Sequence, residues 1–442
     1  MNFTAAAPVS VRPFTPDVQL DARSLTGALT ASGAALLEGW ADDDSWTIFL
    51  PWPAETRALE WTDIAGWREV VSGFESQNRA PDPFPAAPFL GGWVGLLSYE
   101  LGAREEGASL HQGLPPEPPL FFARHESGLL RSSDGMWIFG PPDSIDEDEA
   151  RLRELLNRRS ISVQLSRSPL TIADSLAGSA YRENVEAIRE AIARGDVYQV
   201  NLTRRFETAT VDPSELYHAM TGSEPPRCSA FLRGEGWTIA SASPEVFLRS
   251  DRLLGVAESR PIKGTVRREG NEDDEIRALR SSAKDAAEHL MIVDVVRNDL
   301  GKVAPAGRVS VPAFRTVRTL AHVHHLESTV RAEGLGNVTL AEMLAALLPA
   351  ASITGAPKRA AVGMIRRLEP VARGVYTGAI GFHDFRGRTE LSVAIRTAIV
   401  TPDSARYHAG GGIVWESDPA AEDDESIAKS AAFLSHVRGG KE

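Results

Sequence analysis

The sequence has 442 residues, enough for a large core or two domains, and its 43% hydrophobic and 24% charged residues are typical of a globular protein. The formal net charge of −13 argues against nucleic acid as the main partner, because phosphate binding needs a basic face. No run approaches the roughly 20 apolar residues of a membrane span, and the N-terminus shows no secretion signal. The single cysteine, Cys228, excludes an internal disulfide, indicates a cytoplasmic protein and is interpreted as a buried structural thiol.

Residues 1 to about 140 predict short strands and turns, of which residues 47–50 and 89–97 are the clearest strands. The Pro141–Ser144 segment then interrupts the chain, and an acidic helix is expected to run to about residue 157. A polar connector at 158–170 is the predicted boundary. It divides the chain into an N-terminal region, residues 1–160, and a second region, residues 170–437.

The second region mixes helices and strands. Ser179 is expected to cap a helix that ends at Gly195, and residues 197–206 predict a strand. Helices are predicted over 272–297 and 420–437, and residues 385–388 predict a hairpin turn between two long strands. Because no regular alternation of strand and helix appears, we predict an α+β fold whose large sheets are mixed and mainly antiparallel.

Two acidic pairs could hold a metal ion. Asp285 and Glu288 are three residues apart, as are Glu422 and Glu425, so each pair shares one face of a predicted helix. For an isolated pair a solvated acidic face is the commoner outcome. Here Lys429 follows Glu425 by four residues on the same face, and a run of four apolar residues follows Glu288. Carboxylates in such a setting suit Mg²⁺, which accepts one or two of them and keeps positions open for water or substrate.

Two further residues are candidates for acid–base or nucleophilic chemistry. Lys263 lies between a proline and a glycine, where the backbone can approach a ligand, and a partly buried amine can act as a nucleophile. Glu245 follows a predicted strand of small and apolar residues, so it could be a general acid with a raised pKa. The alternatives are an exposed lysine in a turn and an ion-paired glutamate in a loop.

If residues 391–398 form one regular strand, Arg396 shares a face with three small residues, and its guanidinium group would suit a carboxylate. An exposed face is an equally good interpretation. His322, His324 and His325 form a cluster, but no second group of histidines or cysteines accompanies them, so zinc is disfavoured. The glycines at 410–412 match no dinucleotide fingerprint, and no phosphate-binding loop motif occurs.

Seven segments, in this order along the chain, resemble the chorismate-utilising enzyme family. They cover about residues 170–437, and the N-terminal third resembles the family more weakly. The segments are Asp196–Leu202, Ser241–Glu245, Arg260–Thr265, Glu288–Asp299, Ser352–Lys358, Tyr376–Gly381 and the glycine-rich turn Gly410–Gly412.

The resemblance implies large antiparallel sheets packed in a sandwich flanked by helices, and a Mg²⁺-dependent site. Glu288 and Glu425 match the family's metal ligands, while Asp285 and Glu422 match a second pair that acts through water. His325 matches the histidine that faces the reacting ring and its departing hydroxyl. The residues matching the family's substrate pocket are Gln199, Thr354, Gly355, Tyr376, Arg396, Gly411, Gly412 and Lys429.

Two positions bear on the reaction within the family. Members that add water carry a lysine where this chain has Gln199, which cannot act as that base. Lys263 matches the aminodeoxychorismate branch, in which the lysine attacks the ring with Glu245 as the implied proton donor. Anthranilate synthase component I, which usually has alanine there, is the alternative. Either branch implies a separate glutaminase subunit as the source of ammonia.

The N-terminal third resembles the family's regulatory region, where tryptophan binds. The segment Ala34–Trp40 lies near the family's serine-containing motif but lacks the serine. The missing serine argues against feedback by tryptophan, and a bound structural tryptophan is the alternative.

Overall fold

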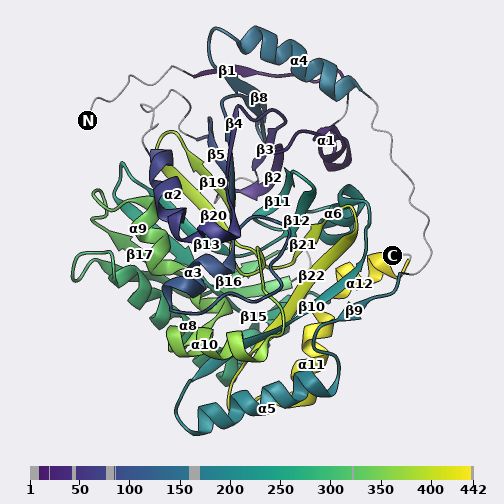
Figure 1. Cartoon of the computed structure of the whole chain (residues 1–442). Coiled ribbons are helices and arrows are strands. Elements are labelled where there is room, and N and C mark those ends of the chain that lie inside the picture. The colour runs from purple at the N-terminus through teal and green to yellow at the C-terminus, as the bar shows by residue number, and fades with distance from the viewer. Residues whose placement is uncertain are drawn as a thin grey trace.

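Two large antiparallel sheets face each other in the computed structural model, and helices cover their outer faces (Figure 1). The structure describes residues 9–18, 20–41, 46–75, 84, 86–158, 170–320 and 323–439. The predicted α+β sandwich with mainly antiparallel sheets is confirmed. Most of the predicted connector at 158–170 lies outside the described residues.

The first sheet has twelve strands within the described residues, and its N-terminal strand β2 pairs with β11 from the second region. In spatial order the strands are β1 (Ser10–Pro13), β8 (Gly135–Gly140), β7 (Gly128–Ser132), β3 (Trp46–Leu50), β2 (Ala35–Trp40), β11 (Ser229–Gly234), β12 (Trp237–Ala242), β21 (Thr397–Val400), β22 (Ser404–Ile413), β10 (Gln199–Ala209) and β18 (Gly355–Ala356), with β9 (Ala173–Asp174) beside β10.

The second sheet has ten strands within the described residues, and here β5 pairs with β19. In spatial order they are β15 (Ile262–Arg267), β17 (Val323–Glu333), β14 (Val256–Arg260), β13 (Val246–Asp251), β20 (Arg388–Val393), β19 (Ala379–Asp384), β5 (Gly92–Leu97), β6 (Leu120–His125) and β4 (Glu55–Leu59), with β16 (Val309–Thr319) beside β17. Residues 10–140 therefore contribute strands to both sheets.

Helices cover three sides of the sandwich. On the first sheet lie α1 (Ala22–Ala28), α4 (Ile145–Asn157), α6 (Pro213–Thr221) and α12 (Ala431–Val437). On the second sheet lie η1 (Trp61–Gly66), α2 (Trp67–Glu75), α3 (Tyr99–Glu105), α8 (Ala283–Gly301), α9 (Leu340–Leu347) and η2 (Ala351–Ile353), with α7 (Glu272–Ser281) against β15 and β17. Around β10 and β22 lie α5 (Ser179–Ala193), α10 (Lys358–Leu368) and α11 (Pro419–Ala428).

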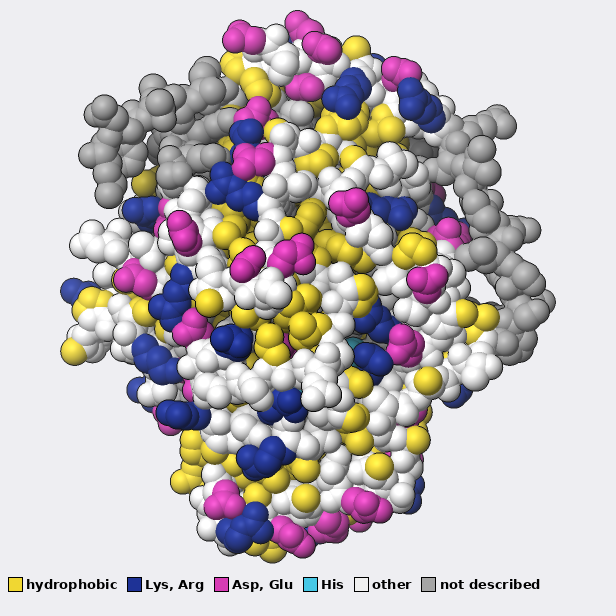
Figure 2. Space-filling view, in the orientation of Figure 1, with side chains coloured by type: hydrophobic (Ala, Val, Ile, Leu, Met, Phe, Trp, Pro, Cys, Tyr) yellow, Lys and Arg dark blue, Asp and Glu magenta, His cyan; other side chains and the backbone are white. Residues whose placement is uncertain are grey.

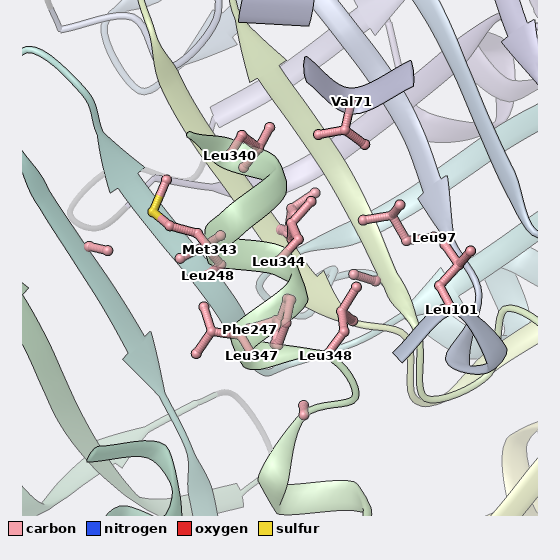
Figure 3. Close-up of a cluster of buried hydrophobic side chains, with 14 of the residues drawn as sticks. Val71, Leu97, Leu101, Phe247, Leu248, Leu340, Met343, Leu344, Leu347 and Leu348 are labelled. Carbon is pink, nitrogen blue, oxygen red and sulfur yellow. The ribbon is translucent and has the colours of Figure 1, made fainter. Parts of the chain in front are cut away.

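Alternating side chains divide the core into layers. Leu37 on β2 and Leu96 on β5 share a cluster between the two sheets. Their neighbours point the other way: Leu36 packs under the helices of the first sheet and Leu97 under those of the second. This period of two is what a strand buried on both faces requires. Figure 3 shows the second outer layer, where Leu344 of α9 lies among side chains from α2, α3, β5 and β13.

The helices correct four expectations. The N-terminal region contains helices as well as strands and turns. Gly178, not Ser179, is the N-cap of α5. The predicted helix at 272–297 is divided at Ser282, whose hydroxyl accepts from the amide of Asp285 and starts α8. The predicted final helix ends at Ala428, and a second one begins at Ala431.

On the face shown in Figure 2, basic and acidic side chains are interspersed, and apolar side chains lie between them. On this face, therefore, the charges are mixed and do not form one large patch of a single sign. Among the described residues no helix has the length and apolar character needed to cross a membrane.

At Gly95 the backbones of β5 and β6 are too close to accommodate a side chain. A Cβ built there would lie 1.9 Å from the carbonyl oxygen of Phe121, so Gly95→Ala must push two central strands apart. We expect the free energy of unfolding to fall by about 3 kcal/mol, measured by urea denaturation. The control is Gly66→Ala, because a Cβ at exposed Gly66 meets nothing within 4 Å. Equal stability of the two variants would contradict the prediction.

Candidate active site

Lys263 lies in an irregular stretch of β15. The register with β17 shifts between Ile262 and Thr265, and Gly264 has a φ of +92°. Such bulges turn a side chain out of the regular alternation. The Nζ of Lys263 is 2.8 Å from the Oε2 of Glu288 on α8, so the predicted nucleophile and a predicted metal ligand form an ion pair. The Lys263 side chain is 22% exposed, which leaves it partly accessible.

Glu245 lies between β12 and β13 and is buried. Burial raises the pKa of its carboxyl group to about 7, although a hydrogen bond with Ser352 and the positive charge of Lys263 oppose that shift. A group with this pKa exists in both protonation states near neutral pH, so it can donate and recover a proton. The expectation of a raised pKa is confirmed.

His325 lies on β17, almost fully buried beside the same bulge. Its Nδ1 is 2.7 Å from the Oγ1 of Thr265, and its Nε2 has no hydrogen-bond partner among the described residues. Burial, followed by the positive charge of Arg396, lowers the pKa of His325 to about 4. The ring is therefore neutral at pH 7, and its unpaired nitrogen is available to a ligand.

The histidines do not form a metal cluster. His324 lies beside His325 but contacts Thr319 and Glu275, while His322 falls outside the described residues. In the part of the chain that the structure describes, no three histidine, cysteine, aspartate or glutamate side chains are close enough together to hold an ion. Cys228 is buried, as predicted, and this burial raises the pKa of its thiol to about 12.

The strand parity predicted for Arg396 is wrong. The second sheet's β20 ends at Val393, and the chain crosses to β21 of the first sheet through residues 394–396. Arg396 is at this crossing with a φ of +49°, and its side chain is exposed. Its charge acts on His325 and on Tyr407, so the guanidinium lies near both residues without belonging to a strand face.

Gln199 lies at the start of β10, where three strands meet. It is fully buried, yet neither atom of its amide has a hydrogen-bond partner among the described residues. A Cβ at Gly412 would lie 2.6 Å from the Gln199 Nε2, and one at Gly355 would lie 2.1 Å from the Gln199 carbonyl oxygen. Gly355, whose φ is +133°, therefore needs glycine, and a side chain at Gly412 would force the Gln199 amide to move. Buried amide groups without partners are rare and mark a place where a ligand can bind.

Thr354 and Tyr376 lie close to these strands. The amide of Asn201 donates to the Thr354 carbonyl at 2.9 Å, while the Thr354 hydroxyl donates to the carbonyl of Ala350. The ring of Tyr376 stacks on His408 with 5.1 Å between centroids, and burial raises the pKa of the Tyr376 hydroxyl above its usual range. Its phenol is therefore a neutral hydrogen-bonding group at neutral pH.

The second acidic pair surrounds Gly411. The Glu422 carboxylate is buried and accepts from Ser417 at 2.6 Å, and a Cβ at Gly411 would lie 2.9 Å from its Oε2. Glu425 is about half exposed and pairs with Lys429 at 2.6 Å. The Nζ of Lys429 also donates to the carbonyl of Gly410 at 3.0 Å. The predicted helix face is thus confirmed for this group.

These donors fit Mg²⁺ in kind. Carboxylate oxygens are the ligands it prefers, and it commonly uses one or two of them, with water and substrate completing its octahedral shell. Glu288 and Glu425 come from different helices, and each is paired with a lysine. An ion at Glu288 would therefore displace Lys263 from its carboxylate. Gly411 allows β22 to approach the Glu422 carboxylate closely, because a Cβ there would lie 2.9 Å from the Glu422 Oε2.

A comparison with known families matches residues 42–435 to the model described as chorismate binding enzyme. The match covers well over half of the chain. The chain belongs to the chorismate binding enzyme family.

Several named proteins are similar to this family member. Aminodeoxychorismate synthase of Streptomyces pristinaespiralis is 36% identical over 367 residues, which cover 78% of the chain and 51% of that protein. The chain thus spans about half the length of that relative. Anthranilate synthase component 1 of Streptomyces coelicolor is 35% identical over 393 residues, covering 81% of the chain and 75% of that protein.

Among solved structures, anthranilate synthase component I of Streptococcus pneumoniae has a similar fold. Its TM-score is 0.72 at 24% sequence identity, with 98% of this chain and 94% of that chain covered. This likeness shows that the chain shares the sandwich fold of that protein.

Sequence reasoning missed three side chains that complete the site. Ser352 hydrogen-bonds with Glu245, and Thr265 hydrogen-bonds with His325. The side chain of Asn201 lies beside Gly412, where a Cβ would be 3.1 Å from the Asn201 Oδ1. Each lies within two residues of, or inside, a segment that carried the family resemblance. Hydroxyl and amide groups are too common in sequences for type alone to single them out.

The raised pKa of Glu245 predicts a pH-dependent stability difference. Between about pH 4.5 and 7 the folded protein keeps a proton on Glu245 that the unfolded chain loses. This carboxyl group therefore stabilises the folded state less as pH rises through that window. Relative to Glu245→Gln, the parent protein should lose about 3 kcal/mol of unfolding free energy from about pH 4.5 to about pH 8, measured by urea denaturation.

The matched control for this pH series is Glu147→Gln at an exposed position on α4, which should follow the parent curve. If the Glu245→Gln and parent curves stay parallel, the carboxyl group of Glu245 does not have the pKa that its burial implies.

Proposed function

We propose that this chain is an aminodeoxychorismate synthase subunit, which converts chorismate and ammonia into 4-amino-4-deoxychorismate. The observation that carries the proposal is the position of Lys263. Its amine extends from an irregular strand to Glu288 at 2.8 Å, and its charge acts on the buried acid Glu245. A lysine beside an acid of pKa about 7 suits nucleophilic displacement of a hydroxyl group.

The proposed substrate is a dianion, which an acidic protein must bind through local positive charge. Arg396 and Lys429 supply two cations, and the backbone at Gly411 and Gly412 offers close approach. The phenol of Tyr376 and the polar groups around Thr354 and Gly355 belong to the same proposed pocket. All these residues lie in the second region, residues 170–437, to which we assign the chemistry.

The proposed Mg²⁺ ligands are Glu288 and Glu425, with Asp285 and Glu422 acting through water. When bound, the ion would neutralise a substrate carboxylate and fix the orientation of the ring. Asp285 lies three residues before Glu288 on α8, and its amide donates to the Ser282 hydroxyl at 3.2 Å.

The proposed reaction has two displacements. In the first, the Nζ of Lys263 forms a bond to ring C2, the ring double bond shifts and the C4–O bond breaks. Glu245 gives its proton to the departing hydroxyl, which leaves as water, and then takes up the proton that the new C2 ammonium group loses. In the second, ammonia bonds to C4, the double bond shifts back, and the C2–N bond breaks as Glu245 returns that proton to the Lys263 amine. Glu245 finally takes the proton lost by the C4 ammonium group, so the enzyme is restored and the sum is chorismate plus ammonia to product plus water.

His325 and Gln199 have separate proposed roles. The free Nε2 of neutral His325 can hydrogen-bond the departing hydroxyl. Gln199 brings a neutral amide to the pocket and has no basic group with which to activate water. A separate lyase would then be needed to release 4-aminobenzoate, because the enolpyruvyl group remains on the product.

Ammonia is proposed to come from a separate glutaminase subunit. The similar protein of Streptomyces coelicolor carries the name component 1, which supports a two-component arrangement. Free ammonium at alkaline pH would substitute for the partner in an assay, because it supplies the same nucleophile.

Anthranilate synthase component I is the second candidate. The anthranilate synthase relative is 35% identical, nearly the same as the 36% of the aminodeoxychorismate synthase relative. Lys263 favours amination at C4 over this alternative, because the proposed first step forms a covalent bond to its amine.

The decisive experiment incubates the chain with chorismate, Mg²⁺ and ammonium. We expect a product that aminodeoxychorismate lyase converts to 4-aminobenzoate. Lys263→Ala should reduce this activity to below about one-thousandth of the parent rate, because the nucleophile is lost. Lys302→Ala, which removes a lysine paired with Asp299, is the control and should keep the activity. Anthranilate and pyruvate as products would overturn the proposal and establish the second candidate.

The proposed ligands give a separate prediction about Mg²⁺. A chelator should abolish amination, and added Mg²⁺ should restore it. Glu288→Gln should raise the Mg²⁺ concentration for half-maximal activity by about tenfold or more, because a neutral amide binds the ion more weakly. Glu147→Gln should respond to Mg²⁺ as the parent does. An unchanged Mg²⁺ response in Glu288→Gln would exclude this carboxylate as a ligand.

A further inference from the structure

The carbonyl group of Lys263 has a specific partner outside the sheet. Regular pairing between β15 and β17 is interrupted between Ile262 and Thr265, so the ladder does not fix the backbone of Lys263. The Nδ1 of His289 on α8 lies 3.2 Å from the Lys263 carbonyl oxygen. His289 is fully buried, and it directly follows Glu288, which contacts the amine of the same lysine.

The other nitrogen of His289 is also engaged. Its Nε2 lies 2.6 Å from the Oγ of Ser328 on β17, and this Oγ accepts from the backbone amide of Arg315 at 2.9 Å. Arg315 has a φ of +51° and lies where the register of β16 with β17 shifts. The amide must be the donor to Ser328, so the hydroxyl proton is left for the Nε2 of His289. The ring proton of His289 is then on Nδ1, which donates to the backbone carbonyl oxygen of Lys263.

We propose that His289, oriented by Ser328, is a positioning residue that fixes the direction of the Lys263 side chain. This inference rests on the proposed function for its catalytic consequence. One helix contacts both ends of the lysine: Glu288 holds the amine and His289 holds the backbone from which the side chain extends. The hydrogen bonds from Arg315 through Ser328 and His289 to Lys263 also connect the irregular stretch of β16 with that of β15. Regular sheet pairing is interrupted at both places.

A buried histidine can be merely a satisfied core residue, and its partners decide between the two roles. Both hydrogen bonds of His289 lead to backbone groups at interruptions of the sheet, one through Ser328 and one directly to Lys263. Losing them would leave strand spacing intact but free the bulge. A small displacement of a nucleophile is enough to reduce a rate strongly, because reaction needs close alignment of the two atoms.

The test compares three variants in the ammonia-dependent assay. His289→Phe removes both bonds, and kcat should fall on the order of a hundredfold, while KM for chorismate stays near the parent value. His289→Asn can place an amide donor near the position of Nδ1 and should recover most of kcat. Ser328→Ala should lower kcat less than His289→Phe, because the ring is still present but free to turn. The Ser328→Ala variant also tests the positioning role if His289→Phe does not fold.

A second measurement reads the lysine directly and needs no substrate. Each variant is treated with dilute acetic anhydride, and mass spectrometry compares acetylation of Lys263 with that of Lys302. Loss of the fixed bulge should weaken the Lys263–Glu288 pair and raise labelling of Lys263 relative to Lys302 in His289→Phe and Ser328→Ala, but not in His289→Asn.

The outcomes separate this inference from the proposed function. If Lys263→Ala aminates normally but labelling still rises in His289→Phe, the proposed function fails and the positioning role stands. If labelling and kcat of His289→Phe match the parent, the positioning role is overturned. It is also overturned if His289→Asn loses as much activity as His289→Phe, because packing of the ring would then explain the effect.

Discussion

The buried ion pair of Arg373 and Glu369 is the interaction on which the substrate-facing part of the structure depends. Both side chains are almost fully buried, and the guanidinium bonds both carboxylate oxygens. Arg373 also donates to the carbonyls of Ile353 at 3.0 Å and Asn201 at 2.9 Å, and Glu369 accepts from the amide of Thr203. Breaking such a pair typically costs about 3–5 kcal/mol, because one charge is left buried alone. Losing this pair would also free the backbone at Ile353, next to Thr354, and at Asn201 and Thr203 in β10.

Close backbone approach is the second constraint around the pocket. Gly355 and Gly412 leave no space for a Cβ beside Gln199, and Gly411 leaves none beside Glu422. Polar groups from β10, β22, β18 and α11 can therefore converge within a short distance. In an acidic chain this convergence matters, since a dianionic ligand would otherwise meet repulsion. In the proposed function, Arg396, the two lysines and backbone amides would supply the positive charge that such a ligand requires.

Periodicity predicted much of the fold, because strand alternation and turn residues are local properties of the sequence. It failed where the chain leaves one element for another. The alternation through Arg396 is regular in sequence, but β20 ends at Val393 and the next strand belongs to the other sheet. The division at Ser282 depends on a cap within an otherwise helical pattern. The local sequence identified Lys263 and Glu245 as candidates, yet their partners Glu288 and Ser352 are distant in sequence, so only the tertiary structure could reveal the contacts.

The two lysine–glutamate pairs suggest how binding and chemistry are linked in the proposed reaction. Glu288 is bonded to Lys263 and Glu425 to Lys429, so each carboxylate already has a cation. A divalent ion held by Glu288 would compete with Lys263 for this carboxylate, which the lysine contacts at Oε2, and would weaken the ion pair. The backbone contact of His289 would keep the lysine directed at the pocket after that exchange. In the proposed reaction one turn of α8 would therefore have two tasks: Glu288 would restrain the amine until an ion binds, and His289 would preserve the direction of the side chain when that restraint weakens.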